Sequence, residues 1–287
     1  MKTIFGNMLT GGGEDIEQVN SLIEYFITPE QMKALMYNCL RVDIPDNNDK
    51  ARIVKKILGL AFKELGTGTN RIALYKNGVV VKVALDRRGL LDNFAEFKRS
   101  PELENYLAKT YETNYLINIC EYIEVMDQDD FYINESAIRE VLKRISEKYL
   151  FDDIGFTDKN SYNWGRRAAK LTEEERKLYG EYADEIYDVV ILDYGYLYPI
   201  RDQKEKLFRC PKCSHKLKWN ATFTSIGCSN SSCNFSVTPM QLRRRMDRSY
   251  EELENQIIAQ FNDLKMPNLA RIEQEISKID AKGMNNP

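Results

Sequence analysis

The sequence has a single histidine, His215, among its 287 residues. Acyl-transfer sites that pair a serine or cysteine nucleophile with a histidine base need a histidine that is able to accept a proton. His215 lies two residues beyond Cys213, within a cluster of cysteines, and is poorly placed for that task. Histidine-dependent nucleophilic catalysis is therefore excluded.

The sequence also lacks any apolar run approaching the ~20 residues that span a bilayer. Residues 1–18 contain one lysine but no sustained apolar stretch, which argues against a secretory signal. These features predict a soluble cytoplasmic protein without a membrane partner. The net charge of −3 argues against a chain-wide nucleic-acid surface but is compatible with a local basic patch.

Hydrophobic periodicity predicts an α+β protein with a helical N-terminal region (1–61), a central α+β domain (62–200), a cysteine-rich module (205–237) and C-terminal helices (238–287). The Asn77-Gly78 pair predicts a tight hairpin. Helices are predicted over 14–26, 28–40, 50–63, 90–98, 135–149, 166–186 (as an insertion) and 238–264, with a short one after Pro267, and strands over 62–65, 71–75, 79–85, 115–119, 120–126 and 189–192.

Four of the six cysteines form two pairs that predict a zinc ribbon. Cys210 and Cys213 are spaced C-x2-C, and Cys228 and Cys233 are spaced C-x4-C, with fourteen residues between the pairs. Two such turns can close a tetrahedron of thiolates around Zn²⁺ at about 2.3 Å per bond. Four protein ligands leave no open position, so the predicted zinc is structural, and His215 is a poor substitute ligand.

Two roles are compatible with the predicted ribbon: it could stabilise the fold of a small module, or it could bind a partner. Lys212, Lys216 and Lys218, with Trp219 and the downstream run Arg243–Arg245, offer charge and one stacking face to a nucleic acid or protein. A solvated helix face is the alternative explanation of the charge run.

A second set of residues is suited to phosphate. Gly66 and Gly68 lie between two predicted strands, where glycine lets the backbone approach phosphates closely. Lys82 lies within an apolar strand, where its charge is costly without an anionic partner, unless it reaches solvent from an edge strand. Glu96, on a predicted helix, could be that partner. The competing glutamates are Glu102 and Glu104.

Further along the chain, oxygen ligands suited to Mg²⁺ follow two apolar segments. Asp158 and Asn163 lie five residues apart in a predicted loop, and Asp193 follows the strand predicted at 189–192. Mg²⁺ binds to one or two carboxylates plus substrate phosphates. Asp158 could accept a hydroxyl proton, or could simply form a turn.

Taken in order, these motifs resemble those of the protein-kinase-like superfamily over about residues 62–200. The residues at 68–71 and 163–165 are similar to those of bacteriophage-encoded members. The resemblance implies a kinase-like N-lobe with a truncated C-lobe, and a hinge at 120–123 that binds adenine. It implies these roles: Gly66 and Gly68 cover ATP, Lys82 contacts the α/β-phosphates, Glu96 holds Lys82, Asp158 is the catalytic base, and Asn163 and Asp193 bind Mg²⁺.

The sequence departs from the kinase pattern in several places. Arg71 stands where a third glycine is expected, and Phe156-Thr157 replaces the residues that usually precede the catalytic aspartate. No Ala-Pro-Glu segment follows the Asp193-Tyr-Gly motif, and the chain reaches Cys210 within fifteen residues of Gly195. Phosphorylation of a protein substrate is therefore in greater doubt than nucleotide binding.

The resemblance implies an atypical ATP- and Mg²⁺-dependent phosphotransferase, encoded by a phage and active in the host cytoplasm. The alternative is an inactive pseudokinase that serves as a scaffold, or as a virion component, and docks a host or phage protein through its ribbon and C-terminal helices. A third interpretation is a ribbon protein that binds nucleic acid.

Overall fold

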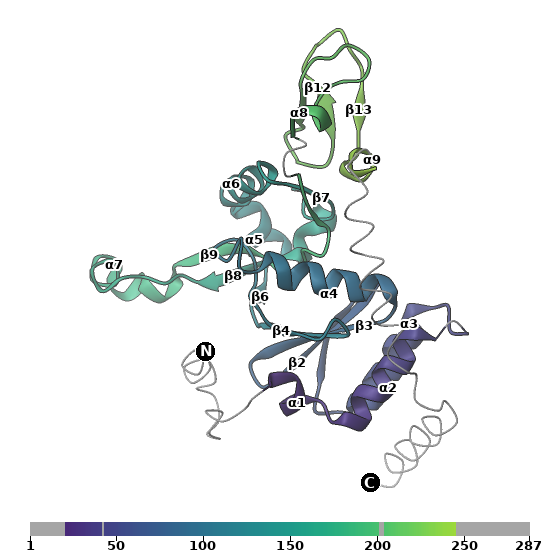
Figure 1. Ribbon diagram of the computed structural model, residues 1–287. Helices are drawn as coiled ribbons and strands as arrows, with labels where there is room; N and C mark the ends of the chain where they lie inside the picture. Colours follow the sequence, from purple (N-terminus) through teal and green to yellow (C-terminus); the bar gives the residue numbers. More distant parts are fainter. Residues whose placement is uncertain (1–20, 42, 201–203, 245–287) are drawn as a thin grey trace. The chain divides into compact units, whose positions relative to one another are not determined.

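Figure 1 shows the computed structural model of the chain, which describes residues 21–41, 43–200 and 204–244. The described residues form two compact units. The first contains 21–98 and 109–122, and the second contains 99–108 and 123–244. Within these residues, no helix is both long and apolar enough to cross a membrane.

The first unit is built on a five-stranded sheet with the order β1-β2-β3-β5-β4, in which all neighbours are antiparallel. Its central strand, β3, is buried along its whole length. The turn before it has φ of 46° at Asn77 and 81° at Gly78, which confirms the predicted hairpin. The strands are β1 (Lys63–Thr67), β2 (Arg71–Lys76), β3 (Val79–Ala84), β4 (Thr110–Thr113) and β5 (Ile117–Glu121).

The helices of the first unit share one hydrophobic core with its sheet. The prediction of a helix opened by Thr28 and Pro29 is confirmed, since Thr28 and Gln31 form a reciprocal capping box. The helical region predicted over 1–61 is therefore not a separate body in the described residues. Its helices are α1 (Leu22–Phe26), α2 (Pro29–Leu40) and α3 (Asn47–Leu58), and α4 (Arg87–Arg99) follows β3.

The second unit has its own core of aromatic and aliphatic side chains. A three-stranded sheet (β6-β8-β9), a two-stranded sheet (β10-β7) and the cysteine-rich sheet (β11-β12-β13) belong to it. Its elements are β6 (Glu124–Val125), α5 (Gln128–Ile133), α6 (Glu135–Ser146), β7 (Tyr149–Phe151), η2 (Asp158–Asn163), β8 (Trp164–Ala168), α7 (Glu173–Tyr179), η3 (Gly180–Glu185), β9 (Tyr187–Ile191), β10 (Leu197–Pro199), α8 (Lys204–Leu207), β11 (Leu217–Trp219), β12 (Ile226–Cys228), β13 (Ser236–Val237) and α9 (Pro239–Arg243).

Several predicted elements were wrong in extent. The insertion predicted to be helical over 166–186 begins as strand β8, which pairs with β9, and is helical from Glu173 to Glu185, in α7 and η3. The helix predicted over 50–63 is α3, which is capped by Asp46 and ends at Gly59 with φ 77°. Tyr115, predicted to begin a strand, has φ 68° in the turn between β4 and β5. The parts of the predicted helices at 14–20 and 245–264 lie outside the described residues.

Candidate functional site

In the first unit, Lys82 and Glu96 form a buried ion pair. Lys82 is on the central strand β3 and Glu96 is on α4, with 2.8 Å between Nζ and Oε1. Lys82 is 8% exposed and Glu96 is fully buried, so water screens their attraction poorly. Of the three glutamates considered as partners, Glu96 is the one that this structure places against Lys82.

Arg71 shares the same carboxylate. Its guanidinium lies 2.9 Å from Oε1 of Glu96, the oxygen that also contacts Lys82, and it donates to Oδ1 of Asn93. The Asn118 amide approaches the other oxygen of Glu96 at 3.4 Å. The residue that stands in place of a third glycine therefore reinforces the ion pair. If Lys82 were replaced, Glu96 would still be paired with Arg71 and would not be left as an unpaired buried charge.

Two glycines precede Arg71: Gly66 lies within β1, and Gly68 lies in the turn between β1 and β2. The Gly68 amide donates to the Arg71 carbonyl at 2.8 Å and closes the turn. A methyl group added at Gly66 would meet nothing within 4 Å, and one at Gly68 would lie 3.6 Å from that carbonyl. Packing within the chain therefore does not require glycine at either position, and both backbones are open to a ligand.

In the second unit, three carboxylates gather near the ends of β7 and β9. Burial, followed by the charges of Asp152 and Asp193, raises the pKa of Asp153. Burial raises the pKa of Asp152 as well. Asp153 also has a left-handed backbone, with φ 61°, a conformation that non-glycine residues keep mainly where the surroundings enforce it. Repelling carboxylates of this kind favour a proton or a metal cation between them.

Asn163 fixes the loop that carries Asp153. The side-chain nitrogen of Asn163 donates to the backbone carbonyl of Asp153 at 2.6 Å. The backbone carbonyl of Asn163 accepts from the amide of Leu192, the residue before Asp193, at 2.8 Å. Asn163 is buried. Because the amide nitrogen is engaged, the side-chain oxygen is the atom that could face a cation. Asn163 and Asp193 lie at adjacent ends of the paired strands β8 and β9, and the Asn163 side chain ties the loop of Asp153, which follows β7, to that end.

Asp158, the predicted base, has a different neighbour. It is exposed at the start of η2, and its carboxylate accepts a hydrogen bond from the Tyr132 hydroxyl of α5. Asp153 was not predicted as a site residue, although an Asp-Asp pair directly after a short apolar segment indicates a site at a strand end.

The four clustered cysteines could hold a metal ion, since all their sulfur atoms lie within 4.8 Å of one another. Sγ–Sγ distances are 3.7 Å for Cys210–Cys233 and 3.4 Å for Cys213–Cys228. Zn–S bonds of about 2.3 Å in a tetrahedron give about 3.8 Å between sulfurs, so the arrangement fits zinc. Ring nitrogen Nδ1 of His215 lies 3.0 Å from the Cys213 carbonyl oxygen. The cysteine pairs lie in the turns that flank β11 and β12.

The hairpin between β11 and β12 packs against the loop that carries the carboxylates. The Phe156 amide donates to the Thr222 carbonyl at 2.8 Å, and the Trp219 ring stacks on Phe151 with centroids 4.5 Å apart. A methyl group added at Gly155 would lie 2.7 Å from the Phe223 carbonyl oxygen, so this approach requires glycine. The cysteine-rich sheet therefore supports residues 151–156.

The remaining cysteines, Cys39 and Cys120, are buried apart from the cluster. Burial raises the pKa of Cys39 to about 12 and that of Cys120 to about 11, so both thiols stay protonated at neutral pH.

Comparison with protein-family models and with curated proteins finds no match to this chain.

Proposed function

We propose that the protein binds ATP with Mg²⁺ and transfers the γ-phosphoryl group, as an atypical kinase-like phosphotransferase of phage origin. The observation that carries the proposal is the buried Lys82–Glu96 pair on a central antiparallel strand and the helix after it. Kinase-like enzymes use such a pair to place a lysine on the α/β-phosphates. The open backbone at Gly66 and Gly68, before that strand, supports the same function.

In this proposal, Asn163 and Asp193 hold Mg²⁺, which would neutralise the charge of the transferring group. Burial, Asp152 and then the charge of Asp193 raise the pKa of Asp153, and this raised pKa favours Asp153 as the group that accepts the hydroxyl proton. We therefore assign the base to Asp153 rather than to Asp158. Zinc at the four cysteines would hold the ribbon against the loop of Asp153.

Replacing Asp153 by asparagine is expected to lower ATP turnover by about 10²–10³-fold, the scale of losing one catalytic group. It should also raise Tm at pH 7 slightly, because Asp153 is exposed and water screens most of the repulsion between the carboxylates. The folded state raises this pKa, so ionisation of Asp153 destabilises the fold at neutral pH, and asparagine also tolerates positive φ. The charge-related part of this gain should vanish below the ordinary carboxyl pKa of about 3.9.

The matched variant is Asp158→Asn, which removes the same charge from another exposed residue, five positions along the chain. Turnover and Tm should be measured for both variants at pH 7, and Tm again near pH 3, below the ordinary carboxyl pKa of about 3.9. A large loss of turnover in Asp158→Asn with little loss in Asp153→Asn would reverse the assignment.

The second candidate function is an inactive scaffold. The observation that favours it is Arg71, which contacts the same oxygen of Glu96 as Lys82 and so stabilises the pair without a nucleotide. A scaffold should keep its zinc and its stability but show no turnover, and it should be indifferent to Asp153→Asn apart from the gain in Tm.

A further inference from the structure

A pocket of about 580 Å³ lies in the second unit between the C-terminal end of α6, helix α8 and strand β11. This volume falls in the range of about 300–1,000 Å³ that is typical of ligand sites. Its cationic lining residues are Lys204, Arg209, Lys216 and Lys218, and its aromatic ones are Phe208 and Trp219. The proposed phosphotransfer site uses none of them.

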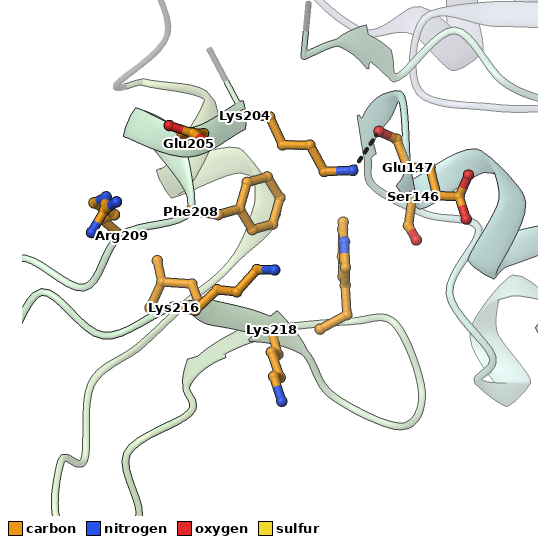
Figure 2. A pocket seen from close by; sticks show the side chains of 10 residues that line it. Ser146, Glu147, Lys204, Glu205, Phe208, Arg209, Lys216 and Lys218 are labelled. Carbon is orange, nitrogen blue, oxygen red and sulfur yellow. Dashed lines mark hydrogen bonds between the residues drawn. The ribbon is translucent and has the colours of Figure 1, made fainter. Parts of the chain in front are cut away.

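The charges of this pocket favour an anion. Lys204, Phe208 and Lys216 reach into the space between α6 and β11, whereas Lys218 points away from it (Figure 2). Lys204 also donates to the Glu147 carbonyl at 3.1 Å, which fixes its position at the end of α6. Two carboxylates, Glu147 and Glu205, line the same space, so without Lys218 three cationic side chains remain against two acidic ones.

The positive charge extends beyond the pocket. Residues 204–244 contain eight lysines and arginines and one acidic residue, Glu205, in a chain whose net charge is −3. A zinc ion with four thiolates would subtract two charges and still leave the segment strongly positive. Charge spread along a module suits a polymer of anions better than one small ion.

The aromatic lining favours a ligand with planar rings. The Trp219 indole nitrogen is buried and has no hydrogen-bond partner, a condition that costs about 1–3 kcal/mol in protein interiors. A base carbonyl could accept this hydrogen bond, and bases pack well on aromatic side chains. A peptide of aspartate and glutamate would supply the charge but no ring.

We propose that this pocket binds a segment of single-stranded nucleic acid, with a backbone phosphate between Lys204 and Lys216 and a base against Phe208 and Trp219. Double-stranded nucleic acid would keep its bases stacked and could not place one in the pocket.

The test uses full-length, zinc-loaded protein and a fluorescein-labelled twelve-residue oligothymidylate, with Kd measured by anisotropy over a range of salt. Lys216→Gln should weaken binding by about tenfold and reduce the slope of log K against log salt by about 0.7, the value for one lost phosphate contact on a single strand. The matched control is Lys218→Gln, two residues away with its ammonium directed outward, and it should have a clearly smaller effect.

A second variant, Trp219→Phe, keeps a ring and removes the indole N–H, and should weaken binding without loss of zinc. Equal effects of Lys216→Gln and Lys218→Gln would overturn the pocket as the site. Equal affinity for duplex DNA or for polyglutamate, or competition by inorganic phosphate at matched phosphate concentration, would show a nonspecific anion surface. No binding of the oligothymidylate would also overturn the proposal.

Discussion

Replacing Asp193 by asparagine is expected to lower Mg²⁺-dependent ATP turnover by about 10²–10³-fold and to leave the protein folded. Asp193 follows β9, and its charge raises the pKa values of Asp153 and Tyr162 nearby. Asparagine keeps the size of the side chain but removes the charge that would hold Mg²⁺.

The measurement is release of the γ-phosphate at several Mg²⁺ concentrations, with Tm recorded on the same samples. Asp188→Asn is the matched control, because Asp188 is an exposed carboxylate on the same strand, β9. Its turnover should equal that of the wild type. If Asp193→Asn keeps wild-type turnover, or if raising the Mg²⁺ concentration has no influence on either protein, the metal-assisted reaction is wrong.

Removing the metal from the four-cysteine cluster is expected to have the largest effect on stability. Structural zinc contributes about 10–16 kcal/mol of apparent binding free energy in small zinc modules, and such modules unfold without it. The ribbon sheet has few hydrophobic residues of its own, and Leu217 and Ile226 are the ones buried within its strands. Chelation or Cys213→Ser should therefore unfold the ribbon.

Unfolding of the ribbon should also disturb the loop that carries Asp152 and Asp153. Phe151 would lose its stacked Trp219, and the Phe156 amide would lose the Thr222 carbonyl, so the loop of Asp153 would lose its support. Turnover should fall along with zinc content. Tryptophan fluorescence should change, because Trp219 is one of only two tryptophans and the other, Trp164, is fully buried.

Two variants separate the metal from the docking contact. Cys120→Ser changes a buried thiol outside the cluster and should keep the zinc and its fluorescence signature. Gly155→Ala leaves all four cysteines intact but places a methyl group 2.7 Å from the Phe223 carbonyl oxygen, so it should reduce turnover while zinc stays bound. Wild-type turnover in a fully chelated protein would contradict a supporting role for the ribbon.

Local signals in the sequence predicted those parts of the fold that depend on few residues. The Asn77-Gly78 turn needs positive φ at adjacent positions, and glycine and asparagine are the residues that adopt it. The cap at Thr28 and the spacing of the cysteine pairs are equally local. The position of Lys82 on a buried strand follows from the apolar residues on either side of it.

The features that could not be predicted from the sequence depend on contacts between residues far apart in the chain. Arg71 was noted only as a departure from a glycine pattern, because its pairing with Glu96 joins residues 25 positions apart. Residues 166–168 form a strand, despite their charge, because β8 pairs with both β6 and β9. The packing of the ribbon hairpin on Gly155 joins segments almost 70 residues apart, so no local sequence pattern predicts it.

The most direct test of the proposed nucleotide site is calorimetric binding of MgATP to the wild type and to Lys82→Met. Glu96 keeps Arg71 and Asn118 in this variant, so the fold should survive. The control is Lys76→Met, on the neighbouring strand β2. We predict that the wild type and Lys76→Met bind MgATP and that Lys82→Met does not. Binding by Lys82→Met with wild-type affinity, or no binding by the wild type, would contradict the proposed function.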